Sequence, residues 1–242
     1  ATSMMGLMMK NEKDELTVII KGGGPIGTIL ATSDAKGMVR GYVQNPDVQV
    51  ENYPNGKLNV AGAVGTDGYV QVIKDLGSYP LVSGEIAEDF THYFALSEQT
   101  PSVVSLGVLT RNMEVERKIT KEDGSEEIVV CREFDVEQAG GFIVQLMPFA
   151  SEETIATLEN NIKDIPSVTT LLKAGNKPED IVEMVLKDLE PKILDVCEVG
   201  FECNCSKERT GKVLQSIGEK ELQAIIDEDK QAEVTCHFCN NK

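Results

Sequence analysis

The chain has 242 residues, of which 41% are hydrophobic and 26% charged, so it has enough apolar material for a core and enough length for more than one domain. Its 23 basic residues stand against 40 acidic ones, and the net charge of -17 would repel nucleic acid. Its apolar runs are far shorter than a bilayer-spanning helix. We therefore expect a globular protein that binds neither nucleic acid nor membrane.

Short runs with the alternation of β-strands dominate residues 16–148. The runs are residues 16–20, 28–32, 38–44, 69–74, 92–96, 103–110 and 141–147. Between residues 111 and 137, alternating residues lie on both sides of Asp123 and Gly124, which is a strong hairpin-turn signal. The pattern predicts a sheet-rich domain with a protruding β-hairpin.

Three glycines after the first predicted strand have the spacing of a dinucleotide-binding loop. Gly22, Gly24 and Gly27 match G-x-G-x-x-G. Pro25 lies inside the motif, however, and the following residues have the pattern of strands instead of a helix. We interpret the segment as a glycine-rich turn between strands.

The pattern becomes helical at residue 151. Apolar residues from 155 to 162 recur at helical spacing, Ser151 is a suitable N-cap, and Pro178 suits the start of a further helix. Each predicted helix is short and has one apolar stripe, so it must lie on another surface, for which the sheet domain is the obvious neighbour. Residues 151–196 are predicted to form a helical connector.

Four of the six cysteines lie in the last forty residues, as the pairs Cys203 with Cys205 and Cys236 with Cys239. The first 130 residues contain none, which disfavours a secreted disulfide framework and favours a reducing, cytoplasmic compartment. Two close pairs can bring four thiolates to one tetrahedral Zn²⁺. The tail has too few apolar residues for its own core, so a metal would supply its folding energy. Residues 197–242 are therefore predicted to form a small zinc-binding domain.

The first cysteine pair encloses a single residue, Asn204, where structural zinc knuckles generally have two. A disulfide across one residue would close a very small, strained and therefore labile ring. Zinc holds its sulfurs as thiolates, the form that oxidants attack first. Oxidising a pair would remove two ligands, expel the metal and unfold the tail. A redox switch and a purely structural zinc site both remain open.

Other side chains that could carry chemistry lack suitable partners. We interpret Cys131 and Cys197 as ordinary thiols, and His237 as surplus because four sulfurs complete a tetrahedron. No nucleophile motif accompanies His92, so it is interpreted as a packed or surface histidine. The sequence predicts no catalytic residue.

Several segments match, in order along nearly the whole chain, a known pattern. They are residues 21–27 (KGGGPIG), 82–90 (VSGEIAEDF), 97–102 (SEQTPS), 139–148 (AGGFIVQLMP), 203–209 (CNCSKER) and 236–239 (CHFC). The sequence thereby resembles the redox-regulated heat-shock chaperone family of thirty-three kilodaltons found in bacteria, the 33 kDa chaperonins.

The resemblance implies an α+β protein in three parts. These are a sheet-rich N-terminal chaperone core at residues 1–150, a redox-sensitive helical linker at 151–196, and a redox-switch domain at 197–242. It also implies an ATP-independent holdase, not an enzyme, whose partners are unfolding client proteins. We expect it to act in the cytoplasm.

The same resemblance assigns roles to the four clustered cysteines. In the reduced form Cys203, Cys205, Cys236 and Cys239 would bind one Zn²⁺ per chain and keep the chaperone inactive. Oxidation would form the bridges Cys203–Cys205 and Cys236–Cys239 and release zinc. Zinc loss would destabilise the linker, expose apolar surface to clients and favour a homodimer.

Two other classes of protein remain as alternatives. A constitutive, structural zinc-binding interaction module would lose its binding on oxidation instead of gaining it. A thiol oxidoreductase using Cys236 and Cys239 would need an exposed, low-pKa thiol in a thioredoxin-like setting. A zinc-ribbon nucleic-acid binder is disfavoured because residues 197–242 hold 6 basic residues against 9 acidic ones.

Overall fold

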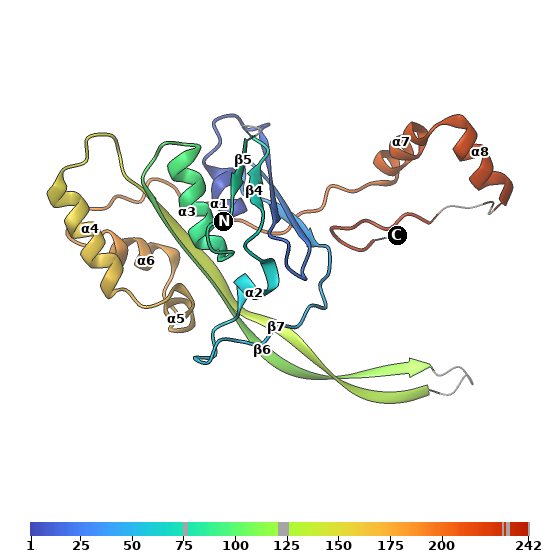
Figure 1. The fold of residues 1–242 in the computed structure, drawn as a ribbon, viewed down its shortest axis with the longest axis horizontal. Coiled ribbons are helices and arrows are strands. Elements are labelled where there is room, and N and C mark those ends of the chain that lie inside the picture. The colour runs from blue at the N-terminus through green and yellow to red at the C-terminus, as the bar shows by residue number, and fades with distance from the viewer. Residues whose placement is uncertain (75–76, 121–125, 229, 231–232, 242) are drawn as a thin grey trace. The chain divides into compact units, whose positions relative to one another are not determined.

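The structure is a computed structural model that describes residues 1–74, 77–120, 126–228, 230 and 233–241. The chain forms two compact units. The sheet unit comprises Thr2–Glu85 and Cys197–Lys242, and the ribbon unit comprises Ala1 and Ile86–Val196. Both units combine helices with strands, which confirms the predicted α+β class (Figure 1). Within the described ranges, no helix combines the length and the apolar character needed to cross a bilayer.

The sheet unit is built on five antiparallel strands in the order β3-β2-β1-β4-β5. Their bounds are Glu15–Lys21 (β1), Thr28–Asp34 (β2), Val39–Val43 (β3), Tyr69–Val72 (β4) and Gly77–Pro80 (β5). The predicted alternation is present in β1, where Leu16, Val18 and Ile20 are buried and the residues between them are more exposed. A short helix, α1 (Thr2–Leu7), packs on β1 and β2 through buried Met5.

The glycine-rich segment joins β1 to β2 as a hairpin loop, so its interpretation as a turn is confirmed. The N–H of Gly24 donates to the carbonyl of Val64 over 2.8 Å, at the end of α2 (Val60–Val64). A Cβ on Gly22 or Gly24 would collide with the backbone of residues 63–65. These glycines therefore serve the close approach of two backbone segments within the sheet unit.

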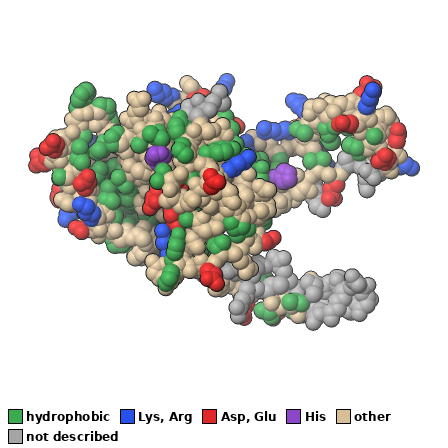
Figure 2. Space-filling model, in the orientation of Figure 1, with side chains coloured by type: hydrophobic (Ala, Val, Ile, Leu, Met, Phe, Trp, Pro, Cys, Tyr) green, Lys and Arg blue, Asp and Glu red, His purple; other side chains and the backbone are tan. Residues whose placement is uncertain are grey.

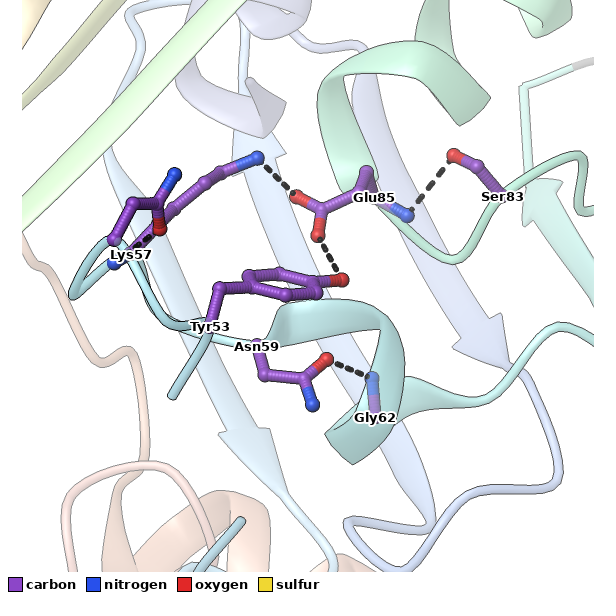
Figure 3. A network of polar contacts seen from close by, with 7 residues as sticks. Tyr53, Lys57, Asn59, Gly62, Ser83 and Glu85 are labelled. Carbon is purple, nitrogen blue, oxygen red and sulfur yellow. Dashed lines mark hydrogen bonds and ion pairs between the residues drawn. The ribbon is translucent and has the colours of Figure 1, made fainter. Parts of the chain in front are cut away.

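The loop after β3 is tied down by one carboxylate, that of Glu85 (Figure 3). Glu85 accepts a hydrogen bond from the Tyr53 hydroxyl at 3.4 Å and pairs with the Lys57 ammonium at 3.3 Å. Its own backbone N–H donates to the Ser83 hydroxyl at 3.2 Å. The Glu85 side chain is mostly buried, with 20% exposed, so these contacts fix the loop more firmly than a surface ion pair would.

The ribbon unit is dominated by a long antiparallel hairpin of β6 (Ser102–Thr120) and β7 (Glu126–Gln145), drawn in green in Figure 1. The strands pair from Ser102 with Gln145 as far as Thr120 with Glu126, which confirms the predicted hairpin. The predicted turn at Asp123 and Gly124 lies outside the described residues.

The predicted strand at residues 92–96 is wrong, because these residues end helix α3 (Ile86–Leu96). Phe90, Tyr93 and Phe94 are buried and have the i, i+3, i+4 spacing of one helical face. Their rings also contact one another edge to face at centroid distances of 6.5 and 5.4 Å. The aromatic residues favour a strand locally, but burying one helical face decides the outcome.

Three helices follow the hairpin: α4 (Glu152–Asp164), α5 (Val168–Lys173) and α6 (Pro178–Val185). The Ser151 hydroxyl caps α4 by accepting from the N–H of Thr154 at 3.1 Å. Helices α4, α5 and α6 together are called the helical cap below. Its buried centre consists of Leu158, Val168, Leu171, Ile181 and Val185. Phe142 and Val144 of β7 and Leu146 just after it pack against this centre, as expected for helices that need another surface.

The helical connector was predicted to continue to residue 196, and this part is wrong. The last helix of the connector, α6, ends at Val185, and residues 190–196 have no regular secondary structure. Asp188 and Glu190 have φ values of 63° and 51°, which an α-helix does not accommodate. The chain therefore leaves the ribbon unit as an irregular segment.

The C-terminal part of the sheet unit contains two more helices, α7 (Lys207–Ile217) and α8 (Glu219–Glu228). Leu222, Ile225 and Ile226 fall on one side of residues 219–228, a pattern that predicts the second helix, whereas the first was not predicted. Neither helix contains a buried residue. Figure 2 shows acidic and basic side chains interspersed with apolar ones over them. These helices lack a packed core of their own.

Two glycines let α5 lie directly on the ribbon. Gly107 and Gly140 face each other across β6 and β7. A Cβ on Gly107 would lie 2.7 Å from the Thr169 methyl carbon, and one on Gly140 would lie 2.7 Å from a Leu172 methyl carbon. Gly107 and Gly140 thus form a flat patch, called the glycine seat below. A larger side chain at either position would occupy the space in which α5 packs.

We predict that Gly140→Val loosens the helical cap, because the added Cβ would lie 2.7 Å from a Leu172 methyl carbon and 3.5 Å from one of Val168. Overpacking of this kind costs about 1–3 kcal/mol. Amide hydrogen exchange should become faster throughout α4–α6 and stay unchanged in β1. Gly211→Val is the control, since a Cβ there meets nothing within 4 Å. Equal exchange in both variants would contradict the role of the glycine seat.

We predict that Glu85→Ala lowers the free energy of unfolding by about 1 kcal/mol, because it removes a hydrogen bond and a partly buried ion pair. A shift of the urea midpoint without a change of slope would measure this loss. Glu51→Ala, on the exposed part of the same loop, serves as the control. An identical midpoint for both variants would show that Glu85 does not anchor the loop.

Candidate metal centre

The first cysteine pair is delivered by a segment that runs beside β3. The N–H of Val39 donates to the carbonyl of Gly200 at 2.8 Å, and the N–H of Glu202 donates to the carbonyl of Val39 at 3.1 Å. The next residue is Cys203. Just after Cys205, the Ser206 hydroxyl caps α7 by accepting from the N–H of Arg209 at 3.2 Å. A strand-like contact before the pair and a helix cap after it fix its position.

The second pair lies in a closed turn. The N–H of Cys236 donates to the carbonyl of Asn241, and the N–H of Asn240 donates to the carbonyl of Cys236, both at 2.8 Å. Asn240 closes the turn with φ at 57°, a left-handed conformation that asparagine tolerates better than most residues. The turn brings Cys236 and Cys239 to the same side.

The Sγ atoms of Cys203, Cys205, Cys236 and Cys239 form a compact sulfur cluster, all within 4.8 Å of one another. The Cys203 and Cys236 sulfurs are 3.6 Å apart, and those of Cys205 and Cys239 are 3.4 Å apart. Around Zn²⁺ with bonds of about 2.3 Å, tetrahedral sulfurs would be separated by about 3.8 Å. The donor set and its spacing therefore fit a tetrahedral, thiolate-loving cation.

The cluster makes its thiols unequal. Backbone N–H groups of Cys239 and Phe238 stabilise the Cys236 thiolate and lower its pKa to about 6. The neighbouring side chains of Cys239 and Cys203 raise the pKa of Cys205 to about 12. Cys236 is thus a thiolate at neutral pH, ready to bind a metal or to attack an oxidant. Binding of a cation would have to drive the deprotonation of Cys205.

The loop between Cys236 and Cys239 contacts the outer face of β3. The Phe238 ring lies edge to face with Tyr42 at a centroid distance of 5.6 Å, and the Arg40 guanidinium carbon lies 5.4 Å from the Phe238 centroid. The His237 ring is 5.7 Å from that of Tyr42. The sulfur cluster is therefore linked to β3 from both of its cysteine pairs.

The other candidate side chains that the structure describes are not among the clustered metal ligands. Among the residues that the structure describes, the four cysteines form the cluster of possible metal ligands. His237 is not part of it. Cys197 is exposed, and His92 is half-buried on α3. Cys131 belongs to β7, but its side chain falls outside the described residues.

Sequence reasoning missed the β3 side of the site. Arg40 and Tyr42 are two residues apart and share a strand face, which is a signal for a partner on that face but not for its identity. It also missed α7, although Ser206 followed by the spaced apolar residues Val213 and Ile217 could have predicted it.

The chain matches known proteins over its whole length. A family model described as "Hsp33 protein" matches residues 1–242. A protein named 33 kDa chaperonin from Clostridioides difficile is 66% identical, and one from Alkaliphilus oremlandii is 47% identical. The match covers 100% of this chain in both cases, with 78% and 77% of the respective relatives.

A solved structure agrees with these matches. The crystal structure of a 33 kDa chaperonin, a heat shock protein 33 homologue from Thermotoga maritima, superimposes with a TM-score of 0.79 at 34% identity. It covers 99% of this chain and 77% of the solved one. From the family match, the relatives and the shared fold, the chain belongs to the Hsp33 protein family.

Proposed function

We propose that this protein is a redox-regulated, ATP-independent holdase, not an enzyme, that keeps unfolding proteins from aggregating in the cytoplasm. The observation that carries this proposal is the sulfur cluster, which lies in a tail whose two helices bury no residue. Membership of a chaperone family supplies the activity to be regulated. The sulfur cluster supplies a chemical means of regulating it.

In the reduced form, Cys203, Cys205, Cys236 and Cys239 would hold one Zn²⁺ ion. The ion would supply the positive charge that keeps four adjacent sulfurs ionised and a fixed point that orders residues 197–242. The backbone N–H groups around Cys236 keep one ligand ionised in advance. The ordered tail would hold the chaperone inactive.

Oxidation would remove the ligands in pairs. Two thiolates lose two electrons to an oxidant such as peroxide, whose O–O bond breaks to give two hydroxide ions, and form one S–S bond, so two such bonds consume all four sulfurs. The family resemblance assigns the bridges to Cys203–Cys205 and Cys236–Cys239. Sulfur contacts of 3.6 and 3.4 Å also join the two pairs, Cys203 to Cys236 and Cys205 to Cys239, so mapping the bridges distinguishes the two pairings.

Loss of the metal would spread from the tail to the linker. Residues 190–196 are irregular, and the preceding helical cap has a small buried centre. A cap of this size depends on its neighbours for order. We propose that residues 197–242 act as the switch, 151–196 as the linker and 1–150 as the chaperone core. The oxidised form would bind unfolding clients and assemble as a homodimer.

We predict that peroxide-treated protein suppresses the aggregation of a heat-unfolded test protein and that zinc-loaded, reduced protein does not. Light scattering would follow aggregation, a chromophoric chelator would report about one zinc released per chain, and peptide mass mapping would identify the bridges. Cys197→Ser should behave like the parent protein, because this exposed thiol lies outside the cluster. Zinc release without any suppression of aggregation would favour a structural zinc-binding module.

We predict that the zinc-stripped, reduced protein is alkylated first at Cys236 and last, within the cluster, at Cys205. With a pKa of about 6, the Cys236 thiolate is mostly present at pH 7. Its reaction with iodoacetamide should be about tenfold slower at pH 5, where most of it is protonated. Timed quenching and peptide mass analysis would give each rate. Equal rates at Cys236 and Cys205 would contradict the assigned pKa difference.

A further inference from the structure

The outer edge of β3 already holds an extended segment of this chain. β3 is the end strand of the five-stranded sheet, and Val39 forms a parallel bridge with Phe201. The Val39 N–H and carbonyl both bond to this segment, at 2.8 Å to the Gly200 carbonyl and at 3.1 Å from the Glu202 N–H. The edge therefore accepts another strand by backbone hydrogen bonds.

The adjoining face of β3 is covered by the loop between Cys236 and Cys239. His237 and Phe238 lie on Tyr42, and Arg40 lies over Phe238. Next to Tyr42 the same sheet face carries a shallow groove of about 370 Å³. Its lining combines Ile19, Leu30, Tyr42 and Tyr69 with polar side chains such as Lys21 and Gln71. The surface thus offers a face of mixed apolar, aromatic and polar side chains beside a hydrogen-bonding edge.

Both covering segments are attached to the sulfur cluster. Phe201 precedes Cys203 by one intervening residue, and His237 and Phe238 lie between Cys236 and Cys239. If the cluster loses its metal, the fixed point after Phe201 is lost together with the two fixed points that flank His237 and Phe238. Opening of the cluster would therefore uncover the edge and the face of β3 in one step.

We infer that the uncovered edge of β3, with the face around Tyr42, binds one extended strand of an unfolding client in place of residues 199–202. This inference rests on the proposed function and names its binding surface. Val39, Gly41 and Val43 alternate along the strand and so present their backbone groups to the same edge. The residues of this edge would pair with the client backbone, and the groove, which has both apolar and polar walls, would receive client side chains.

An extended polypeptide fits this surface for two physical reasons. Backbone hydrogen bonds at a sheet edge do not depend on the side chains of the added strand, which suits a chaperone with many clients. An open edge also invites unwanted pairing and is normally kept covered. The segment at residues 199–202 provides that cover in the same bonding mode as the proposed client.

The backbone donor of Val39 provides the test. Val39→Pro removes the N–H that bonds to Gly200, and proline is tolerated on an edge strand where that N–H points away from the sheet. Val39→Thr keeps the N–H and the branched shape, so it separates loss of the donor from loss of the valine side chain. We expect oxidised Val39→Pro to bind a carboxymethylated, unfolded test protein at least about tenfold more weakly than Val39→Thr, as measured by fluorescence anisotropy.

Residue-resolved amide exchange on the full chain gives a second readout. In the reduced, zinc-loaded protein the N–H groups of Val39 and Glu202 should both be protected, and oxidation should expose both. Addition of the unfolded test protein should protect Val39 again while Glu202 stays exposed. Unchanged exchange in β1 would show that Val39→Pro leaves the sheet folded.

Each other outcome overturns the inference. If oxidised Val39→Pro binds the test protein as tightly as oxidised Val39→Thr does, the β3 edge binds only residues 199–202 and is not a client site. If Val39 becomes protected with rising chain concentration and no test protein, the occupant is a second copy. If the oxidised parent protein binds no test protein at all, the proposed function itself fails.

Discussion

The convergence of four sulfur atoms on one point is the constraint on which the C-terminal part of this protein depends. Helices α7 and α8 bury no residue, so apolar packing does not hold the tail together. The cysteines come from two segments separated by those helices, and their sulfurs lie within 4.8 Å of one another. Ionised sulfurs this close repel each other unless a cation lies among them. The order of the tail is therefore linked to the chemistry of its thiols.

The thiol chemistry is connected to β3 by direct contacts. A metal centre that only stabilised its own tail would have a local effect. Here the residues next to the cysteines bond the edge of an otherwise separate sheet through Val39, and they cover Tyr42 with Phe238. A change in the sulfur cluster can thus alter the surface of the sheet, which is what a switch requires.

The helical cap of the ribbon unit suits a segment that must be released. Its buried centre holds five residues, and α5 lies on a glycine seat that contributes contact area without interlocking side chains. Such a cap is ordered while its neighbours are ordered, and a modest loss elsewhere is enough to free it. The irregular residues 190–196 connect this cap to the first cysteine pair. The marginally packed helical cap and the reactive thiols therefore lie in consecutive parts of the chain.

The sequence by itself determined the features that depend on local pattern. Spacing of the cysteines predicted their clustering, alternation predicted most strands and the long hairpin, and Ser151 and Pro178 marked helix starts. It failed at residues 92–96, where the aromatic residues suited a strand but one buried helical face won, and at residues 186–196, where left-handed backbone ended the helix. Only the tertiary structure decided that Gly200 bonds Val39 and that Phe238 covers Tyr42. Backbone edges and aromatic faces accept many partners, so their local sequence does not specify which distant segment will occupy them.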